Sequence, residues 1–131
     1  DGLNTLTPAV DKAVSAFIED IHQRGMADDV LLVMTGEFGR TPRINKNGGR
    51  DHWGNLCPLV FVGGGLKMGQ VIGQSDPHGG EPISDHVSSQ QVLATIMNTL
   101  FDTGKLRLQQ GIPREIEATM TGGDPIYQLF S

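Results

Sequence analysis

The chain has 131 residues, 37% of them hydrophobic, which is long enough for one domain with a hydrophobic core. Its formal net charge of −5 disfavours broad binding to nucleic acid or to anionic membranes. No apolar run approaches the roughly 20 residues that cross a bilayer, and no signal-peptide pattern opens the sequence. The first residue is not Met, so we expect the sequence to be a piece of a longer protein.

The first predicted element is an amphipathic helix over residues 8–24. Thr7 followed by Pro8 is typical of a helix start, because a hydroxyl caps the first turn and the proline ring suits the first helical position. Gly25 is the predicted stop. The apolar positions recur at spacings of three and four and are Val10, Val14, Phe17, Ile18 and Ile21.

Two apolar runs predict strands that are buried on both faces. They are DDVLLVMTG, residues 28–36, and PLVFVGGG, residues 58–65. A second helix is predicted over residues 88–101, where Ser88 and Gln91 have the spacing of a capping box. Helix and strand therefore alternate, which indicates an α/β domain with helices flanking a mainly parallel sheet. The pattern weakens after residue 104, and we expect residues 121–131 either to pack loosely or to dock elsewhere.

About twenty residues between the two strands show neither helical nor strand periodicity, and loops of that length are usually functional or disordered. This loop leaves the carboxyl end of the first strand, where ligands bind in open α/β sheets. From residue 37 to residue 52 it carries four cations and two anions, a local balance of +2. The cations are Arg40, Arg43, Lys46 and Arg50, and the anions are Glu37 and Asp51.

The donor types in this loop suit a divalent metal. Glu37, Asp51 and His52 offer the oxygen and nitrogen ligands that zinc, magnesium or manganese bind. The arginines suit an anionic substrate, because the planar guanidinium matches two oxygens of a phosphate or sulfate group. Each residue taken alone is more often a turn, capping or hydrogen-bonding residue, so spacing leaves the metal site and the structural role both open.

Two further histidines each have an aspartate close by. Asp85 and His86 precede the second helix, where a carboxylate is favoured by the helix dipole, and we favour a structural role for His86. His78 lies in a turn rich in glycine and proline, and its role stays open. We therefore place His78 with Arg40 and Arg50 among the candidate substrate-binding residues.

Several segments in order resemble one family. GEFGRTPRIN, GGRDHW, GGGLKMGQVIG and VLATIMNTL, with the helix and strand that precede them, are similar to the C-terminal portion of domain-of-unknown-function family 1501. That family resembles the alkaline phosphatase and sulfatase superfamily. The resemblance implies a mixed, mainly parallel sheet between helices and one or two divalent metals, here zinc, manganese or calcium. Residues 1–131 would then be a single domain that forms the C-terminal fragment of a larger sulfatase-like domain.

The resemblance also assigns roles to particular residues. It implies that Glu37 and His52 are metal or substrate ligands, with Asp51 and Arg50 beside them. Phe38 stands where the superfamily has a histidine ligand, so one nitrogen ligand is missing. The nucleophile and the first metal carboxylates of the superfamily lie near its N-terminus, which this chain does not match. A missing N-terminal part of the same protein would supply them, and the resemblance implies export to the periplasm or outside the cell.

Three functions follow as hypotheses. The preferred one is the C-terminal part of a metal-dependent hydrolase of phosphate or sulfate esters, with the fragment alone inactive. The alternative is a non-catalytic sulfatase-like module that binds an anionic glycan or a partner protein. The third is a purely structural loop pinned by Arg50–Asp51 and Arg40–Glu37 ion pairs, which ranks last because exposed pairs contribute only about 0–1 kcal/mol.

Overall fold

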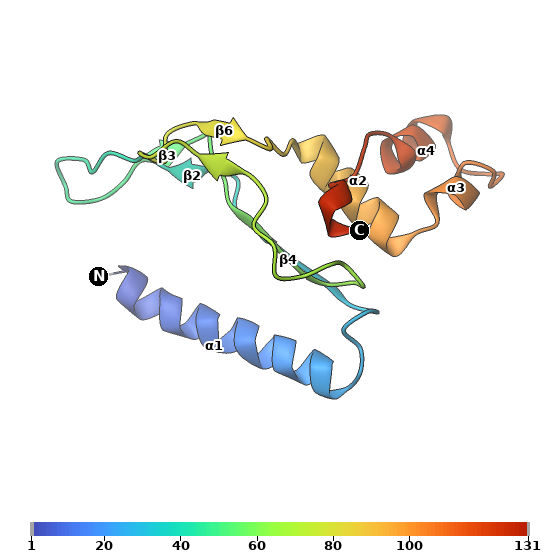
Figure 1. The fold of residues 1–131 in the computed structure, drawn as a ribbon, viewed down its shortest axis with the longest axis horizontal. Coiled ribbons are helices and arrows are strands. Elements are labelled where there is room, and N and C mark those ends of the chain that lie inside the picture. Colours follow the sequence, from blue (N-terminus) through green and yellow to red (C-terminus); the bar gives the residue numbers. More distant parts are fainter. Residues whose placement is uncertain (1, 131) are drawn as a thin grey trace.

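A computed structural model describes residues 2–130 and contains helices around short antiparallel strand pairs (Figure 1). In chain order the elements are α1 (Gly2–Gln23), β1 (Leu31–Thr35), β2 (Gly39–Arg40), β3 (His52–Trp53), β4 (Leu59–Gly63), β5 (Gln74–Ser75), β6 (Pro82–Ser84), α2 (Ser89–Leu100), α3 (Thr103–Leu106), α4 (Arg114–Thr121) and the 3₁₀-helix η1 (Tyr127–Leu129). Among these residues, no helix combines the length and the apolar character that crossing a bilayer requires.

Helix α1 confirms the predicted periodicity but not the predicted start. It begins at Gly2, so Pro8 lies inside the helix and Thr7 is not its N-cap. Its end agrees with the sequence, because Gly25 adopts φ +68° and its N–H bonds to the carbonyl of His22 at 3.1 Å. None of its residues is buried, and the helix lies to one side of the strands (Figure 1). Periodicity thus predicted the helix without predicting what it packs against.

The two predicted strands exist as β1 and β4 and pair directly with each other. Their pairing is antiparallel, with Leu31 opposite Gly63 and Thr35 opposite Leu59. The two strands therefore run in opposite directions, so that Glu37 follows one end of the ribbon and Gly64 the other. The mainly parallel sheet of a larger domain stays a prediction.

The long connection between β1 and β4 is less irregular than its sequence suggested. β2 and β3 pair antiparallel within it, with Gly39 opposite Trp53 and Arg40 opposite His52. Gly39 is required there, because a Cβ would collide with the carbonyl oxygen of Leu56. The loop proper is thereby reduced to residues 41–51.

The core lies under α2, which confirms the second predicted helix. Ser88 and Gln91 form the capping box, and Ala94 and Thr95 are buried. Of the two alternatives for the C-terminal segment, loose packing is wrong for residues 121–130, because Ile126 and Leu129 are 5% and 7% exposed. Together with Leu66 they form the buried cluster of the described chain. The segment is irregular in sequence because η1 is too short to show a period.

Hydrogen bonds attach this C-terminal segment to the rest of the core. The Thr95 hydroxyl accepts a 2.9 Å bond from the Ile126 N–H, and the Lys67 N–H bonds to the Leu129 carbonyl at 2.8 Å. The Thr95 hydroxyl also donates to the Gln91 carbonyl at 2.7 Å. The C-terminal segment is therefore held to the core both by buried apolar side chains and by hydrogen bonds that satisfy the buried polar groups.

Candidate functional site

The base of the loop of residues 41–51 is closed by one pair of residues. Thr41 and Asp51 are joined by a backbone hydrogen bond of 3.0 Å, and the Asp51 N–H also donates to the Thr41 hydroxyl at 3.0 Å. The same hydroxyl donates to the Arg43 carbonyl at 2.8 Å. The ends of the loop are thus held together by the short β2–β3 ladder and by side-chain bonds that continue it.

Asn45 orders the far end of this loop. Its side-chain oxygen accepts from the backbone N–H groups of Asn47 and Gly49, both at 3.0 Å. Its side-chain amide donates to Asp51 Oδ1 at 2.8 Å. Gly48 adopts φ +74°, which glycine tolerates without strain. The charge pattern does not single out Asn45, although asparagine is common in turns because its side chain bonds to the backbone two residues on.

Arg50 holds the opposite side of the loop through its own backbone contacts. Its Nη1 donates to the carbonyl oxygens of Thr41 and Pro42, at 2.7 and 2.6 Å. Its other guanidinium nitrogens have no hydrogen-bond partner among residues 2–130. One nitrogen therefore fixes the guanidinium while the others stay available, which is a pre-organised arrangement for an oxyanion.

Phe38, His52 and Arg40 form a small stack beside the loop. The rings of Phe38 and His52 lie 3.9 Å apart between centroids at an angle of 28°. The Arg40 guanidinium carbon lies 5.8 Å from the Phe38 ring centroid, within cation–π range. Arg40 and His52 also face each other in the β2–β3 pair. The segment after β1 therefore meets His52 through the aromatic ring of Phe38.

The three predicted metal ligands do not complete a metal site on their own. Among the described residues, no group of three or more His, Cys, Asp or Glu side chains is placed to hold a metal ion. Glu37 and His52 are exposed, while one carboxylate oxygen of Asp51 is bonded to Asn45. The donor types suit zinc or manganese, but the donor set is incomplete among residues 2–130.

His78 lies in a turn that is organised by Asp76. The Asp76 carboxylate accepts from the N–H groups of His78, Gly80 and Glu81 at 2.8 to 3.0 Å. These bonds, led by the one from Gly80, hold the pKa of Asp76 below its ordinary value, because they favour the charged carboxylate. The imidazole of His78 is exposed. It remains a candidate for substrate binding.

This turn is tied to the strand that follows the loop. The indole N–H of Trp53 donates to the Gly80 carbonyl at 2.7 Å, and the amide of Asn55 donates to the Glu81 carboxylate at 2.5 Å. A Cβ on Gly80 would lie 3.8 Å from the ring of Pro42. The loop with Arg50 and the turn with His78 are therefore neighbours, and the bond from Trp53 to Gly80 that joins their hairpins spans 27 positions of sequence.

The loop cations are not neutralised by ion pairs within the chain. The ion pairs among residues 2–130 are Arg24–Asp20 and Lys105–Asp102, and both lie elsewhere. The hypothesis of Arg50–Asp51 and Arg40–Glu37 pairs is therefore wrong, because Arg50 binds carbonyls and Arg40 lies over an aromatic ring. The loop is structured, as that hypothesis required, yet its positive charges stay available.

The loop, the stacked ring beside it and α2 all lie within the segment that matches one family. The sequence matches the family described as "Protein of unknown function (DUF1501)" over residues 1–127, and the chain belongs to that family. No curated protein matches it, and neither does any solved structure.

Proposed function

We propose that the chain is the anion-binding part of a metal-dependent, sulfatase-like hydrolase of phosphate or sulfate esters. The observation that carries the proposal is the fixed guanidinium of Arg50, which offers free donors from an ordered and cationic loop. Arg40 and His78 would contact the same anionic ester from the stack and from the neighbouring turn. In water-poor surroundings such fixed donors stabilise negative charge on a transferred group.

The remaining parts of the site would come from elsewhere in the same protein. Glu37 and His52, with the free oxygen of Asp51, would be this chain's contribution to a site for zinc, manganese or calcium. A missing N-terminal part would contribute the nucleophile and further carboxylates. This division agrees with the incomplete donor set of the chain. The family resemblance also supports a periplasmic or secreted location for the parent protein.

The surface area supports a larger parent domain. The chain exposes 9730 Å², whereas a compact protein of 14.1 kDa exposes about 6,700 Å². The excess of about 3,000 Å² is in the range of an obligate interface. β1 also has one edge without a strand partner among the described residues. Both features support the proposal that β1 and β4 belong to a wider sheet, whose mainly parallel strands and flanking helices are proposed from the family resemblance.

Hydrolysis by the full-length parent protein tests the proposal. We expect release of p-nitrophenol from p-nitrophenyl phosphate or p-nitrophenyl sulfate, together with stoichiometric metal in elemental analysis. A Glu37→Ala, His52→Ala double variant should bind metal about tenfold or more weakly and lose turnover. The matched control is Glu19→Ala, His22→Ala, which removes the same residue types from exposed positions of α1. Unchanged metal content and turnover in the first variant would refute the proposal.

The second candidate is a non-catalytic module that binds an anionic glycan. The observation in its favour is Phe38, whose ring occupies the face of His52 at the place where a second nitrogen ligand is expected. Binding of heparin by the full-length protein, without bound metal and without turnover, would decide for this candidate. Loss of that binding in Arg50→Ala, with retention in Arg114→Ala, would assign it to the loop.

A further inference from the structure

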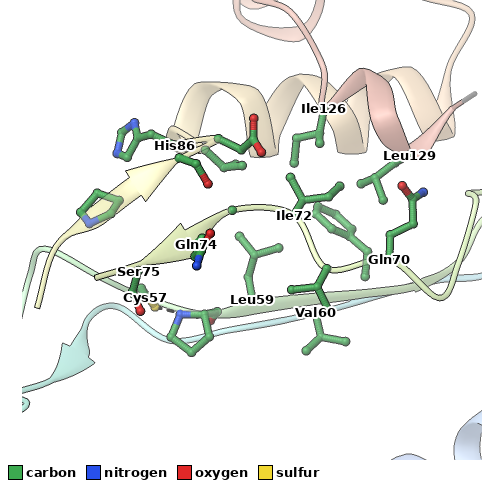
Figure 2. Close-up of a pocket in the computed structure, with 18 of the residues that line it drawn as sticks. Cys57, Leu59, Val60, Gln70, Ile72, Gln74, Ser75, His86, Ile126 and Leu129 are labelled. Atoms are coloured by element: carbon green, nitrogen blue, oxygen red, sulfur yellow. Dashed lines mark hydrogen bonds between the residues drawn. The ribbon is translucent and has the colours of Figure 1, made fainter. Parts of the chain in front are cut away.

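A second feature, separate from the loop, is a hollow of about 650 Å³ beside β4 (Figure 2). Residues 67–75 and 84–87 form its other walls. Leu59, Val60 and Phe61 all line it, although successive strand residues point to opposite faces. A space that touches three consecutive residues must run along the edge of the strand, so the hollow follows the outer edge of β4.

The backbone on both sides of this hollow lacks hydrogen-bond partners. Among residues 2–130, β4 pairs with β1 and with no other strand, so its outer edge is unpaired. Across the hollow, the backbone groups of Val71 and Ile72 make no hydrogen bond within the same residues. Unpaired strand edges bind an added strand readily, because each polar backbone group is stabilised by a partner.

The hollow is apolar inside and carries opposite charges at its ends. Ile72, Ile126 and Leu129 lie along it, on the side away from β4 (Figure 2). The positive charge belongs to Lys67, which lies at the end near Leu129 because its backbone N–H bonds to the Leu129 carbonyl. The negative charge belongs to Asp85, which lies at the other end, next to His86. Neither Lys67 nor Asp85 has an ion-pair partner in the described part of the chain. The hollow thus offers charge complementarity to a segment that is basic at one end and acidic at the other.

We propose that the hollow binds an extended peptide segment of a partner protein, which adds a strand along the outer edge of β4. β4 runs from the end near His86 and Cys57 toward the end near Leu129 (Figure 2). A segment parallel to β4 then places a basic N-terminal end at Asp85 and an acidic C-terminal end at Lys67. Five residues of strand span about 17 Å, and alternate side chains would enter the apolar hollow. This inference does not depend on the proposed hydrolase.

Two peptides of identical composition test the direction and the charges. The probes are fluorescein-labelled KVTVTVE and EVTVTVK, titrated with the purified full-length protein in low salt and followed by fluorescence anisotropy. We expect KVTVTVE to bind about tenfold more tightly, because two exposed ion pairs replace two repulsive contacts. Lys67→Glu should remove this preference, while Lys12→Glu, which makes the same charge change on exposed α1, should keep it.

Asp85→Asn is the second variant, because asparagine tolerates the φ of +43° that Asp85 adopts. This variant should bind KVTVTVE more weakly, and its circular dichroism spectrum should match that of the native protein. Equal binding of both peptides would overturn the proposed direction, since EVTVTVK can make the same two ion pairs when it runs antiparallel to β4. Absence of binding, or a preference that Lys67→Glu does not alter, would overturn the proposal as a whole.

Discussion

In the loop of residues 41–51 no residue is buried, whereas α2 and η1 enclose Thr95 and Leu129 almost completely. The loop is ordered by a set of hydrogen bonds centred on Asn45 and Arg50. The C-terminal region is ordered by the burial of a few apolar side chains. Removal of single residues should therefore have local consequences in the loop and global consequences in the core.

The largest expected effect is that of Leu129→Ala. This side chain is buried in a core that contains few other buried residues, so its loss leaves a cavity that costs about 2–4 kcal/mol. Urea unfolding followed by circular dichroism measures the change. Phe130→Ala is the control, because Phe130 is the next residue in the sequence and its side chain is 44% exposed. An equal loss of stability in the two variants would contradict the assignment of Leu129 to the core.

Thr95→Val should have the second-largest effect and lower the free energy of unfolding by about 1–3 kcal/mol. The hydroxyl of the fully buried Thr95 is the acceptor for the Ile126 N–H, which valine would leave unpaired. Thr99→Val is a matched control, since the Thr99 hydroxyl bonds only to a carbonyl of its own helix. The same unfolding experiment separates the two variants. Similar stability for both would mean that the bond to Ile126 contributes little.

Asn45→Ala should cost about 1 kcal/mol or less in global stability, yet alter the loop strongly. Hydrogen exchange of the Asn47 and Gly49 amides is the sensitive measurement, because both donate to the Asn45 side chain. Their protection should fall while that of α2 is unchanged. Asn47→Ala is the control, since only its backbone takes part. Unchanged amide protection in Asn45→Ala would show that the loop is ordered by other contacts.

The smallest expected effect is a pH dependence at Asp76. Its pKa is lowered in the folded chain, so the unfolded chain binds this proton more readily. The stabilisation is present above the ordinary pKa of aspartate and is lost as the pH falls through the lowered value. The stability difference between the native chain and Asp76→Asn should therefore shrink between neutral pH and strong acid. A difference that stays constant over this range would contradict the assigned cause.

The sequence predicted the elements that depend on a local pattern of residues, such as helices and helix caps. Apolar spacing located α1 and α2, and Ser88 with Gln91 predicted the observed capping box. It did not predict that Pro8 lies within α1 or that β1 pairs antiparallel with β4, because both depend on neighbours that spacing does not specify. Ile126 and Leu129 were missed as core residues for the same reason.

The sequence identified the charged loop but not its contacts. The density of charge singled out residues 37–52, and whether they form a functional site stays a prediction. The sequence did not show that Arg50 would hold backbone carbonyls or that Phe38 would cover a face of His52. Those contacts are made across the β2–β3 hairpin, whose two-residue strands are too short to leave a pattern. All six assigned roles stay predictions: metal ligands for Glu37, Asp51 and His52, and substrate binding for Arg40, Arg50 and His78.

The bond from Trp53 to Gly80 has a practical consequence for anyone who purifies this protein. Trp53 is the one tryptophan of the chain, and its indole sits where the two hairpins meet. Its intrinsic emission is therefore a built-in optical probe of that junction. Titration with sulfate, phosphate or a glycan can be followed through this tryptophan without attaching a dye. Separation of the two hairpins would shift the wavelength of its emission maximum.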